Sequence, residues 1–518
     1  MVDGGSITKA RCLLIASSAV VLGAAAGCDA WDPRPPPDRG ALDAETIRLL
    51  NEKDPTRPRA EEAPARAPAL HRVYARARFV WIRPRPKDGD EWLGYLTQGQ
   101  DVAVRGDRTT WVAGTGSTCE TWVPIEPKGW VCLGRDATLD RTDELYRTLA
   151  SSSARIDSAW PFDYAQSLGA PRYRTIPTKD DQARRESSHL ARLARAKRAE
   201  SPTAIAAFDK NLAQADLSLT GEPAPAVFRA PFTVLEGDED VPLGSTVAYT
   251  AEFDHEDRAF VLTSDHAVVP LSRLKRYPRS DFRGVELGKE AHLPGAFFRR
   301  GGRPTWKRSA GGAMTRTGSK LPPRGYAALT GATVTEGGRR FLETKTADWV
   351  DDKDVIVVEP QAKVPRALPD EGRRTWVEVS TLGGWLVAFE GERPVFTTLI
   401  SAGRGDLRPD NTMIDASATP NGTFTVGTKL RAANMRSENR PGRIHAEVMF
   451  TQVFHEAFAL HGAYWHDEFG DRKSAGCVNL SPIDAKWLFD WSEPQLPDGW
   501  HAMTARAGDG ATIVVIHP

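Results

Sequence analysis

Short stretches in which apolar and polar residues alternate recur along most of this chain, and they are separated by glycine, proline and aspartate. Examples are residues 73–86 (VYARARFVWIRPRP), 92–106 (WLGYLTQGQDVAVRG) and 245–253 (STVAYTAEF). Alternation with a period of two is typical of half-buried β-strands. The 37 prolines and 44 glycines favour short strands joined by loops over helical bundles. The sequence therefore predicts a mainly β protein.

Length and charge limit the organisation and the partners. At 518 residues the chain exceeds one ordinary domain, so two to four domains are expected. Its 68 basic residues equal its 68 acidic residues. Nothing global in the charge indicates nucleic acid as a partner, or a membrane surface bound by charge.

The N-terminus has the pattern of an export signal. Lys9 and Arg11 precede an apolar run, residues 12–26, that is too short for a comfortable membrane span. The run ends in Ala25-Ala26-Gly27-Cys28, which resembles a bacterial lipobox. That resemblance implies a signal peptide over 1–27, lipidation of Cys28 and an exported, membrane-anchored lipoprotein facing the periplasm or cell wall. Leucine is commoner at the position of Ala25, and an ordinary secretory signal is the alternative.

Composition divides the remaining chain into five regions. Residues 28–70 are rich in proline and charge and predict a tether containing one short helix over 41–54. Residues 71–137 form a β module whose last part, 118–132 (TCETWVPIEPKGWVC), resembles bacterial SH3-like modules. Such modules either bind peptidoglycan or serve as spacers around an aromatic core. The other three regions are a helical linker over 138–225, one or two small β modules over 226–370, and a C-terminal domain over 371–518.

The five cysteines have different expected fates. Export would remove Cys12 and acylate Cys28. Cys119 and Cys132 lie in one β module and predict a disulfide in an oxidising compartment. Cys477 is then the odd thiol, and a catalytic role would explain its presence in an exported protein.

One stretch near the C-terminus, residues 461–480 (HGAYWHDEFGDRKSAGCVNL), has the residue types of a cysteine nucleophile with its base. A nearby imidazole, that of His461, stabilises the thiolate form of Cys477, which is the attacking species. Gly476 keeps the backbone beside the sulfur open, so that N–H groups can face a developing oxyanion. The alternative is a buried cysteine with an unrelated histidine.

The spacing of this stretch resembles the signature of the L,D-transpeptidases (YkuD-type). The matching residues are His461-Gly462 and, after a gap, Ser474-Ala475-Gly476-Cys477-Val478-Asn479. Ala475 departs from the histidine common at its position, which would weaken substrate contacts or shift the pKa of the thiol. A second motif upstream, residues 419–424 (TPNGTF), is similar to the family's Thr-Pro-x-Gly-x-Phe turn. The resemblance covers 375–518 and implies a β-sandwich or barrel domain.

The resemblance also implies a reaction. Cys477 would attack the carbonyl between the diamino acid and the terminal D-Ala of a peptidoglycan tetrapeptide stem, with His461 as general base and acid. An amine from a second stem would resolve the acyl-enzyme into a 3-3 cross-link, with no cofactor and no metal. Backbone N–H groups of Gly476 and Cys477 would hold the oxyanion. Supporting roles fall to Ser474, Asn479, the carbonyl of Gly462 or Ala463 as imidazole partner, and His466.

Several alternatives remain at this point. His466 is a rival base, although a hydrogen-bonding role at the pocket edge is expected for it. A zinc site would need His445, His455, His461 and His466 to converge, and their spacings match no standard ligand motif. Water could resolve the same acyl-enzyme, which would make an L,D-carboxypeptidase. A non-catalytic wall-binding lipoprotein is the third alternative, supported by Ala475 alone.

Overall fold

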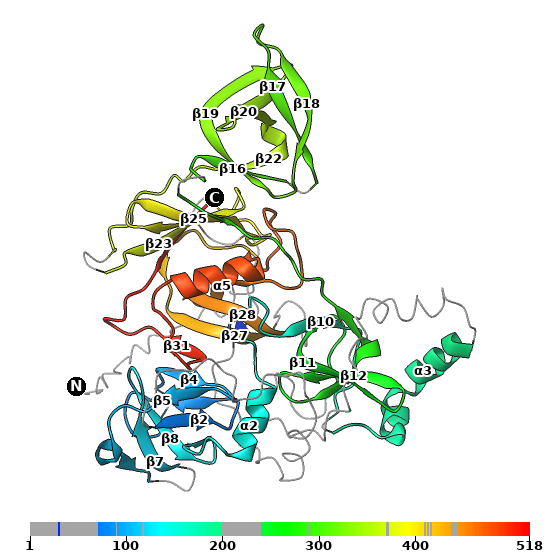
Figure 1. Ribbon diagram of the computed structural model, residues 1–518, viewed down its shortest axis with the longest axis vertical. Coiled ribbons are helices and arrows are strands. Elements are labelled where there is room, and N and C mark those ends of the chain that lie inside the picture. The colour runs from blue at the N-terminus through cyan, green and yellow to red at the C-terminus, as the bar shows by residue number, and fades with distance from the viewer. Residues whose placement is uncertain are drawn as a thin grey trace, which may run out of the picture.

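The computed structural model describes residues 30–31, 71–198 and 240–518, apart from short gaps at 90, 116–118, 174, 289–290, 300, 369–371, 409–410, 412–413, 415–416 and 437–443. The predicted signal peptide, the lipidation site Cys28, the helix predicted over 41–54 and nearly all of the tether lie outside the described residues. Within them the protein is mainly β, as predicted, and it consists of three small modules around a C-terminal domain (Figure 1).

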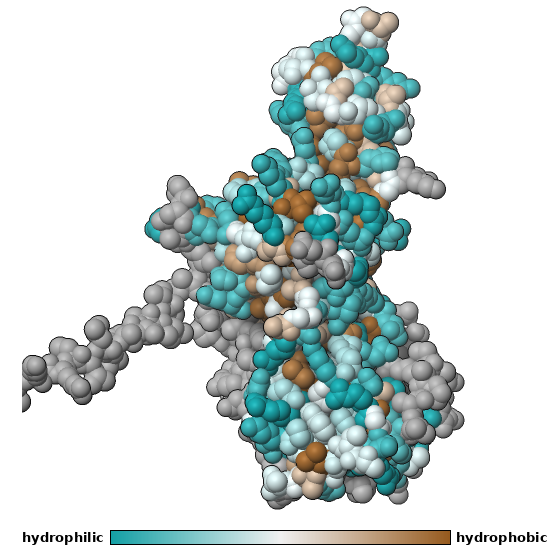
Figure 2. Space-filling model, turned by 90° about the vertical axis from the view of Figure 1, so that its left-hand side faces the viewer, coloured by the Kyte–Doolittle hydropathy of each residue, from teal (hydrophilic) through white to brown (hydrophobic). Residues whose placement is uncertain are grey.

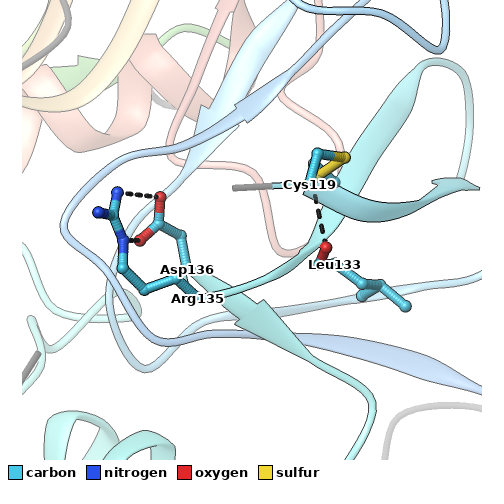
Figure 3. Close-up of a disulfide and its surroundings, with 5 residues drawn as sticks. Cys119, Leu133, Arg135 and Asp136 are labelled. Carbon is cyan, nitrogen blue, oxygen red and sulfur yellow. Dashed lines mark hydrogen bonds and ion pairs between the residues drawn. A yellow bond between two sulfur atoms is a disulfide. The ribbon is translucent and has the colours of Figure 1, made fainter. Parts of the chain in front are cut away.

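The first module is built from short strands between residues 72 and 138, followed by one helix. Cys119 and Cys132, the cysteines for which the sequence predicts a disulfide, are bonded across two neighbouring strands, close to the ion pair of Arg135 with Asp136 (Figure 3). Its elements are β2 (Arg72–Ala75), β3 (Val80–Ile82), β4 (Gly94–Leu96), β5 (Asp101–Ala103), η1 (Arg108–Thr110), β6 (Val112–Ala113), β7 (Cys119–Pro124), β8 (Trp130–Gly134), β9 (Ala137–Thr138) and α2 (Glu144–Ser151).

The first module shares its core with the end of the chain. The ring of Trp500 is wholly buried among the apolar residues of this module, and its Nε1–H donates to the Glu126 carbonyl oxygen at 3.1 Å. Strand β4 pairs with β31 (Ala502–Thr504), so β3 and β4 extend a sheet of the C-terminal domain. The domain limits expected from the sequence, 71–137 and 371–518, therefore do not enclose two separate cores. Residues from both ranges, almost 400 positions apart, form one hydrophobic core.

The second module is a five-stranded sheet in the order β13-β12-β11-β10-β14. One strand, β10, lies in the region predicted as a helical linker, although α2 and the helix α3 there are helical as expected. The sequence of β10, DYAQS, is too short and polar to show alternation, and its pairing with β11 and β14 makes it a strand. The elements are β10 (Asp163–Ser167), α3 (Lys179–Arg198), β11 (Thr246–His255), β12 (Arg258–Thr263), β13 (Val268–Pro270), η2 (Leu271–Arg273) and β14 (Leu274–Arg276).

The third module is a seven-stranded sheet that forms a separate lobe, joined to the rest at a narrow waist (Figures 1 and 2). Residues 277–288, here called the connecting segment, lead into it and contribute β15 (Val285–Glu286) to a sheet of the C-terminal domain. The elements of the lobe are β16 (Gly295–Phe298), β17 (Arg303–Arg308), β18 (Met314–Leu321), β19 (Tyr326–Glu336), β20 (Arg339–Thr344), β21 (Trp349–Asp351), η3 (Asp352–Asp354) and β22 (Val355–Val358).

The C-terminal domain is a β-sandwich of two sheets with α5 packed into the same core. The six-stranded sheet has the order β15-β25-β24-β23-β32-β26, and the other has the order β3-β4-β31-β27-β28-β29-β30, with β1 (Ala30–Trp31) on β27. The domain's elements are β23 (Thr375–Ser380), β24 (Trp385–Glu390), β25 (Arg393–Leu399), β26 (Gly422–Thr425), β27 (Thr428–Arg436), β28 (Ile444–His455), β29 (Phe458–Gly462), β30 (Val478–Leu480), α5 (Pro482–Trp491) and β32 (Ile513–His517).

Both faces of the six-stranded sheet are covered. Val377 and Val379 point into the core of the sandwich, whereas the alternate residue Trp376 packs toward the third module. Burial on both faces explains why β23 and β24 contain so many apolar residues.

Hydrogen bonds at both ends of α5 hold the helix against the sheet that contains β27. Ser481 Oγ accepts the Asp484 N–H at 3.1 Å, with Pro482 in the first turn, as is common at helix starts. At the other end, the buried ammonium of Lys429 donates to the carbonyls of Phe489 at 2.6 Å and Ser492 at 2.9 Å, which satisfies acceptors that a helix end leaves open.

Candidate active site

The register of two parallel strands brings the candidate base and nucleophile together. β29 and β30 pair with Leu460 opposite Val478 and His461 opposite Asn479. Cys477 directly precedes β30, so it lies on the neighbouring strand, offset from His461 by two residues. With strand spacings of about 4.8 Å and 3.3 Å per residue, their Cα atoms are roughly 8 Å apart, within reach of the two side chains.

Hydrogen bonding sets the tautomer of His461. Its Nδ1 lies 3.2 Å from the Gly462 carbonyl oxygen. A carbonyl only accepts, so Nδ1 carries the proton and Nε2 keeps its lone pair. Gly462 is one of the two residues whose carbonyl the resemblance assigns to this role.

Aromatic rings surround His461. It is 3% exposed, and the ring of Trp465 lies 5.8 Å from its own ring and 4.6 Å from that of His445. Trp465 was not among the expected site residues, although its place in the Tyr464-Trp465-His466 run after the histidine was a usable signal. Its indole limits access of water to the imidazole.

The turn before Cys477 is held by its own polar groups. Gly476 has a φ of +134°, a conformation that glycine adopts much more readily than other residues. Its N–H donates to Ser474 Oγ at 2.8 Å, and the same hydroxyl donates to the Cys477 carbonyl. In this conformation Ser474 accepts the Gly476 N–H, and the role of that N–H toward an oxyanion stays a prediction.

A threonine from the upstream motif supports the same turn. Thr419 Oγ1 donates to the Gly476 carbonyl at 2.6 Å and accepts the Gly403 N–H at 2.8 Å. The sequence places Thr419 in a family-like turn, yet its partner is 57 residues away. Only folding shows that the two motifs are joined through this hydroxyl.

The side chain of Cys477 is buried, with 3% of its surface exposed. Because the thiolate is the nucleophile, any reaction at Cys477 requires its sulfur in the reduced form. The sulfur lies 3.8 Å from the Ala457 carbonyl oxygen, at the turn between β28 and β29.

Both ring nitrogens of His466 have partners other than Cys477. Nδ1 accepts the Glu468 N–H at 3.2 Å, so the proton of the neutral ring is on Nε2. Nε2 lies 3.1 Å from Nδ2 of the Asn479 amide, whose Oδ1 has no partner among the described residues. Two donors cannot bond to each other, so we exchange the amide O and N of Asn479 and assign Oδ1 as the acceptor of the Nε2–H, which satisfies both groups. His466 therefore anchors Asn479, and neither of its nitrogens is left to take a thiol proton.

Burial keeps the His466 ring neutral. Removal from water lowers its pKa to about 4, although the Glu468 carboxylate acts in the opposite direction. A neutral ring is what the two hydrogen bonds require, since a protonated Nδ1 would face the Glu468 N–H. The backbone of Asn479 is fixed as well, because its N–H and carbonyl pair with Ser401 at 2.9 Å each.

The site has no obvious metal ligands. Within the described residues, no group of three histidines, cysteines or carboxylates is close enough to hold a metal ion. The rings of His445 and His461 each lie near the Trp465 indole.

One cleft lies away from the candidate site. It has a volume of about 530 Å³, between the connecting segment, the third module and the start of α5. Its lining includes Arg283, Tyr326, Phe396, Asp484 and Trp487, but neither Cys477 nor His461. Chemistry, and not the size of a cavity, therefore locates the candidate site.

Comparison with known proteins gives one family. Residues 374–516 match the family model of the L,D-transpeptidase catalytic domain, YkuD. No curated protein matches the chain. Within the described residues, no helix has the length and apolar character to cross a membrane.

Solved structures similar to this chain include several L,D-transpeptidases. One from Xylanimonas cellulosilytica is 21% identical over 31% of this chain and 71% of its own, with a TM-score of 0.19. One from Enterococcus faecium, in a cysteine-to-serine form, is 21% identical over 28% of this chain and 49% of its own, with a TM-score of 0.20. One from Mycobacterium smegmatis is 15% identical over 50% of this chain and 90% of its own, with a TM-score of 0.21.

Proposed function

Because residues 374–516 match the family model of the YkuD L,D-transpeptidase catalytic domain, we propose that this protein is a cysteine-dependent L,D-transpeptidase acting on peptidoglycan stems. The observation that carries the proposal is the Nδ1–H of His461 bonded to the Gly462 carbonyl, on the strand beside Cys477. In the neutral ring Nε2 is then the basic nitrogen, on a side chain two residues from Cys477 in the register of the two strands.

The reaction follows in two steps. With Cys477 reduced, His461 Nε2 takes the thiol proton, and the sulfur attacks the carbonyl that joins the diamino acid to the terminal D-Ala. A carbon–sulfur bond forms, the carbon–nitrogen bond breaks, and His461 returns the proton to the departing D-Ala amine. In the second step an amine of another stem attacks the thioester and restores the thiol, which gives a 3-3 cross-link.

Burial of the site favours an amine over water as the acceptor. Cys477 and His461 are each 3% exposed, and the Trp465 indole lies against the imidazole. A dry pocket protects an acyl-enzyme from hydrolysis. Hydrolysis of the same intermediate remains the competing outcome that an experiment must separate.

We also propose an exported, membrane-anchored location. The N-terminal sequence up to Cys28 supports lipidation, and the disulfide between Cys119 and Cys132 supports an oxidising compartment. Metabolic labelling with a radioactive fatty acid should mark the wild-type protein and not Cys28→Ala. Equal labelling of both would exclude the anchor.

The direct test of the activity is mass analysis of muropeptides incubated with reduced, purified protein. We expect a tetrapeptide donor to lose D-Ala and to appear as a cross-linked dimer. A tripeptide product without dimer would indicate an L,D-carboxypeptidase. Absence of both products and of any carbapenem adduct on Cys477, in a folded sample, would indicate a non-catalytic wall-binding protein and would falsify the proposal.

A further inference from the structure

The loop between His461 and Cys477, residues 463–473, contacts two accessory modules. The contact with the second module precedes His466 in the sequence, and the contact with the third module follows it. Before His466, the Tyr464 ring stacks on Tyr164 of the second module with centroids 3.8 Å apart. The Tyr464 hydroxyl lies 2.7 Å from Thr246 Oγ1, on β11 of that module, and donates to the Ala446 carbonyl at 2.6 Å.

After His466, Asp467 is bound from the other side. Arg324, in the turn between β18 and β19 of the third module, donates through both terminal nitrogens to the two carboxylate oxygens of Asp467. Ser280 of the connecting segment donates to the same carboxylate. A bidentate contact of this kind fixes the orientation of the Asp467 carboxylate as well as its distance from Arg324.

Arg324 is itself held in place. Its backbone has a φ of +57°, in the left-handed region that non-glycine residues rarely adopt. Its N–H donates to the Phe298 carbonyl at 3.0 Å, and its guanidinium lies 5.1 Å above the Phe282 ring. Phe282 in turn stacks on Phe469 of the 463–473 loop at 5.8 Å. An uncommon backbone conformation that presents a side chain to another domain is typical of a position with a functional constraint.

We propose that Arg324 and Asp467 are positioning residues for the transpeptidase reaction, so that the third module completes an active site to which it contributes no reacting group. The proposal rests on the proposed function. The route is short: Asp467 is one residue from His466 and one from Glu468, whose N–H binds the His466 ring. That ring holds Asn479, which pairs with His461 and follows Cys477 by two residues.

Stability alone would not explain this arrangement. The side chain of Asp467 is 38% exposed and that of Arg324 is 13% exposed. Ion pairs with one partner this accessible to water add little to the free energy of unfolding. Small errors in the placement of catalytic groups, in contrast, reduce rates steeply. We therefore expect disruption of the pair to affect reactivity more than melting temperature.

The test compares four full-length variants with the wild type, all with Cys477 reduced. Arg324→Gln removes the charge, and Arg324→Lys keeps the charge without the planar fork. The exchange of Arg324→Asp with Asp467→Arg restores an opposite pair. Arg303→Gln is the matched control, because Arg303 forms an ion pair with Asp354 inside the third module. The readouts are the rate of carbapenem acylation, the pH profile of Cys477 alkylation by iodoacetamide, and the melting temperature.

We expect Arg324→Gln to slow acylation about tenfold and to move the alkylation profile to higher pH, with little change in melting temperature. Arg324→Lys should recover part of the rate, the exchanged pair should recover more, and Arg303→Gln should match the wild type. Unchanged acylation and alkylation in Arg324→Gln would overturn the proposal, as would losses that merely follow melting temperature. Alkylation needs only a thiol, so it still reports on positioning if the wild type forms no acyl-enzyme and the proposed function itself fails.

Discussion

The turn that carries Cys477 and the loop that carries His466 are close in sequence, but they are held in different ways. The Cys477 turn is held from within its own domain, by Ser474 and by the Thr419 hydroxyl on the Gly476 carbonyl. The 463–473 loop has hydrogen bonds to its own domain, such as Gly470 N–H to the Ile400 carbonyl, but it is also held from outside. The outside contacts are with Tyr164 and Thr246 of the second module and with Arg324 of the third.

Because the turn and the loop are held differently, substitutions in them should affect the reaction differently. The turn that carries Cys477 relies on hydroxyl groups of its own domain, which bond to the backbone of the turn. The loop relies on side chains more than 100 residues away in the sequence, which other parts of the chain must deliver. Changes in the turn should therefore abolish or slow the reaction directly, whereas changes in the loop should tune it.

The largest effect is expected at the nucleophile. Cys477→Ala should eliminate acyl-enzyme formation completely, because no other group in the turn can form the thioester. The side chain is small and buried, so the melting temperature should change by only a few degrees. Mass spectrometry of reduced protein after carbapenem treatment checks this, and an adduct on Cys477→Ala would rule out the assigned nucleophile.

The next largest effect is expected at His461, and it should exceed the effect of the same substitution at His466. His461→Gln should reduce turnover about 10²- to 10⁴-fold and move the apparent pKa of the Cys477 thiol toward its free value of about 8.5, because the imidazole both shuttles the proton and stabilises the thiolate. His466→Gln should leave that pKa largely in place, since both of its nitrogens already have partners. The measurement is the pH profile of iodoacetamide alkylation. The opposite pattern would mean that the base belongs to the loop.

A smaller effect is expected at Thr419. Thr419→Val keeps the shape of the side chain and removes the hydrogen bonds to the Gly476 carbonyl and from the Gly403 N–H. At roughly 1 kcal/mol for each neutral hydrogen bond, their loss corresponds to about a thirtyfold slower acylation. Thr423→Val, at an exposed position of β26, is the matched control. Equal rates for both variants would show that the turn does not depend on these contacts.

The smallest effect concerns the pH dependence of stability. Burial lowers the pKa of His466 to about 4, below the usual 6.5, so the unfolded chain binds more protons than the folded one between these values. His466 therefore makes stability rise with pH from about 4 to 6.5. We expect His466→Gln to flatten this rise in urea unfolding curves. His266 and His501, whose pKa values burial also lowers, keep part of the slope in the variant. A slope identical to that of the wild type would indicate that the His466 ring is accessible to water.

Local patterns in the sequence predicted much of the fold and indicated a candidate reactive pair. Alternation predicted the mainly β class, and the stretches 73–86, 92–106 and 245–253 contain β3, β5 and most of β11, because strands show their period within a few residues. The spacing of His461 and Cys477 identified the candidate base and nucleophile, since the chemistry of a side chain is readable without its surroundings.

Tertiary structure decided whatever depends on partners distant in sequence. Three features depend on segments tens to hundreds of residues apart: the pairing that makes β10 a strand, the burial of Trp500 in the first module and the ion pair of Arg324 with Asp467. Hydrogen bonding in the folded state also assigned the donors and acceptors: the Gly476 N–H to Ser474, and the nitrogens of His466 to Glu468 and Asn479. The sequence determined which groups are present, and packing determined which of them are already satisfied and which remain for chemistry.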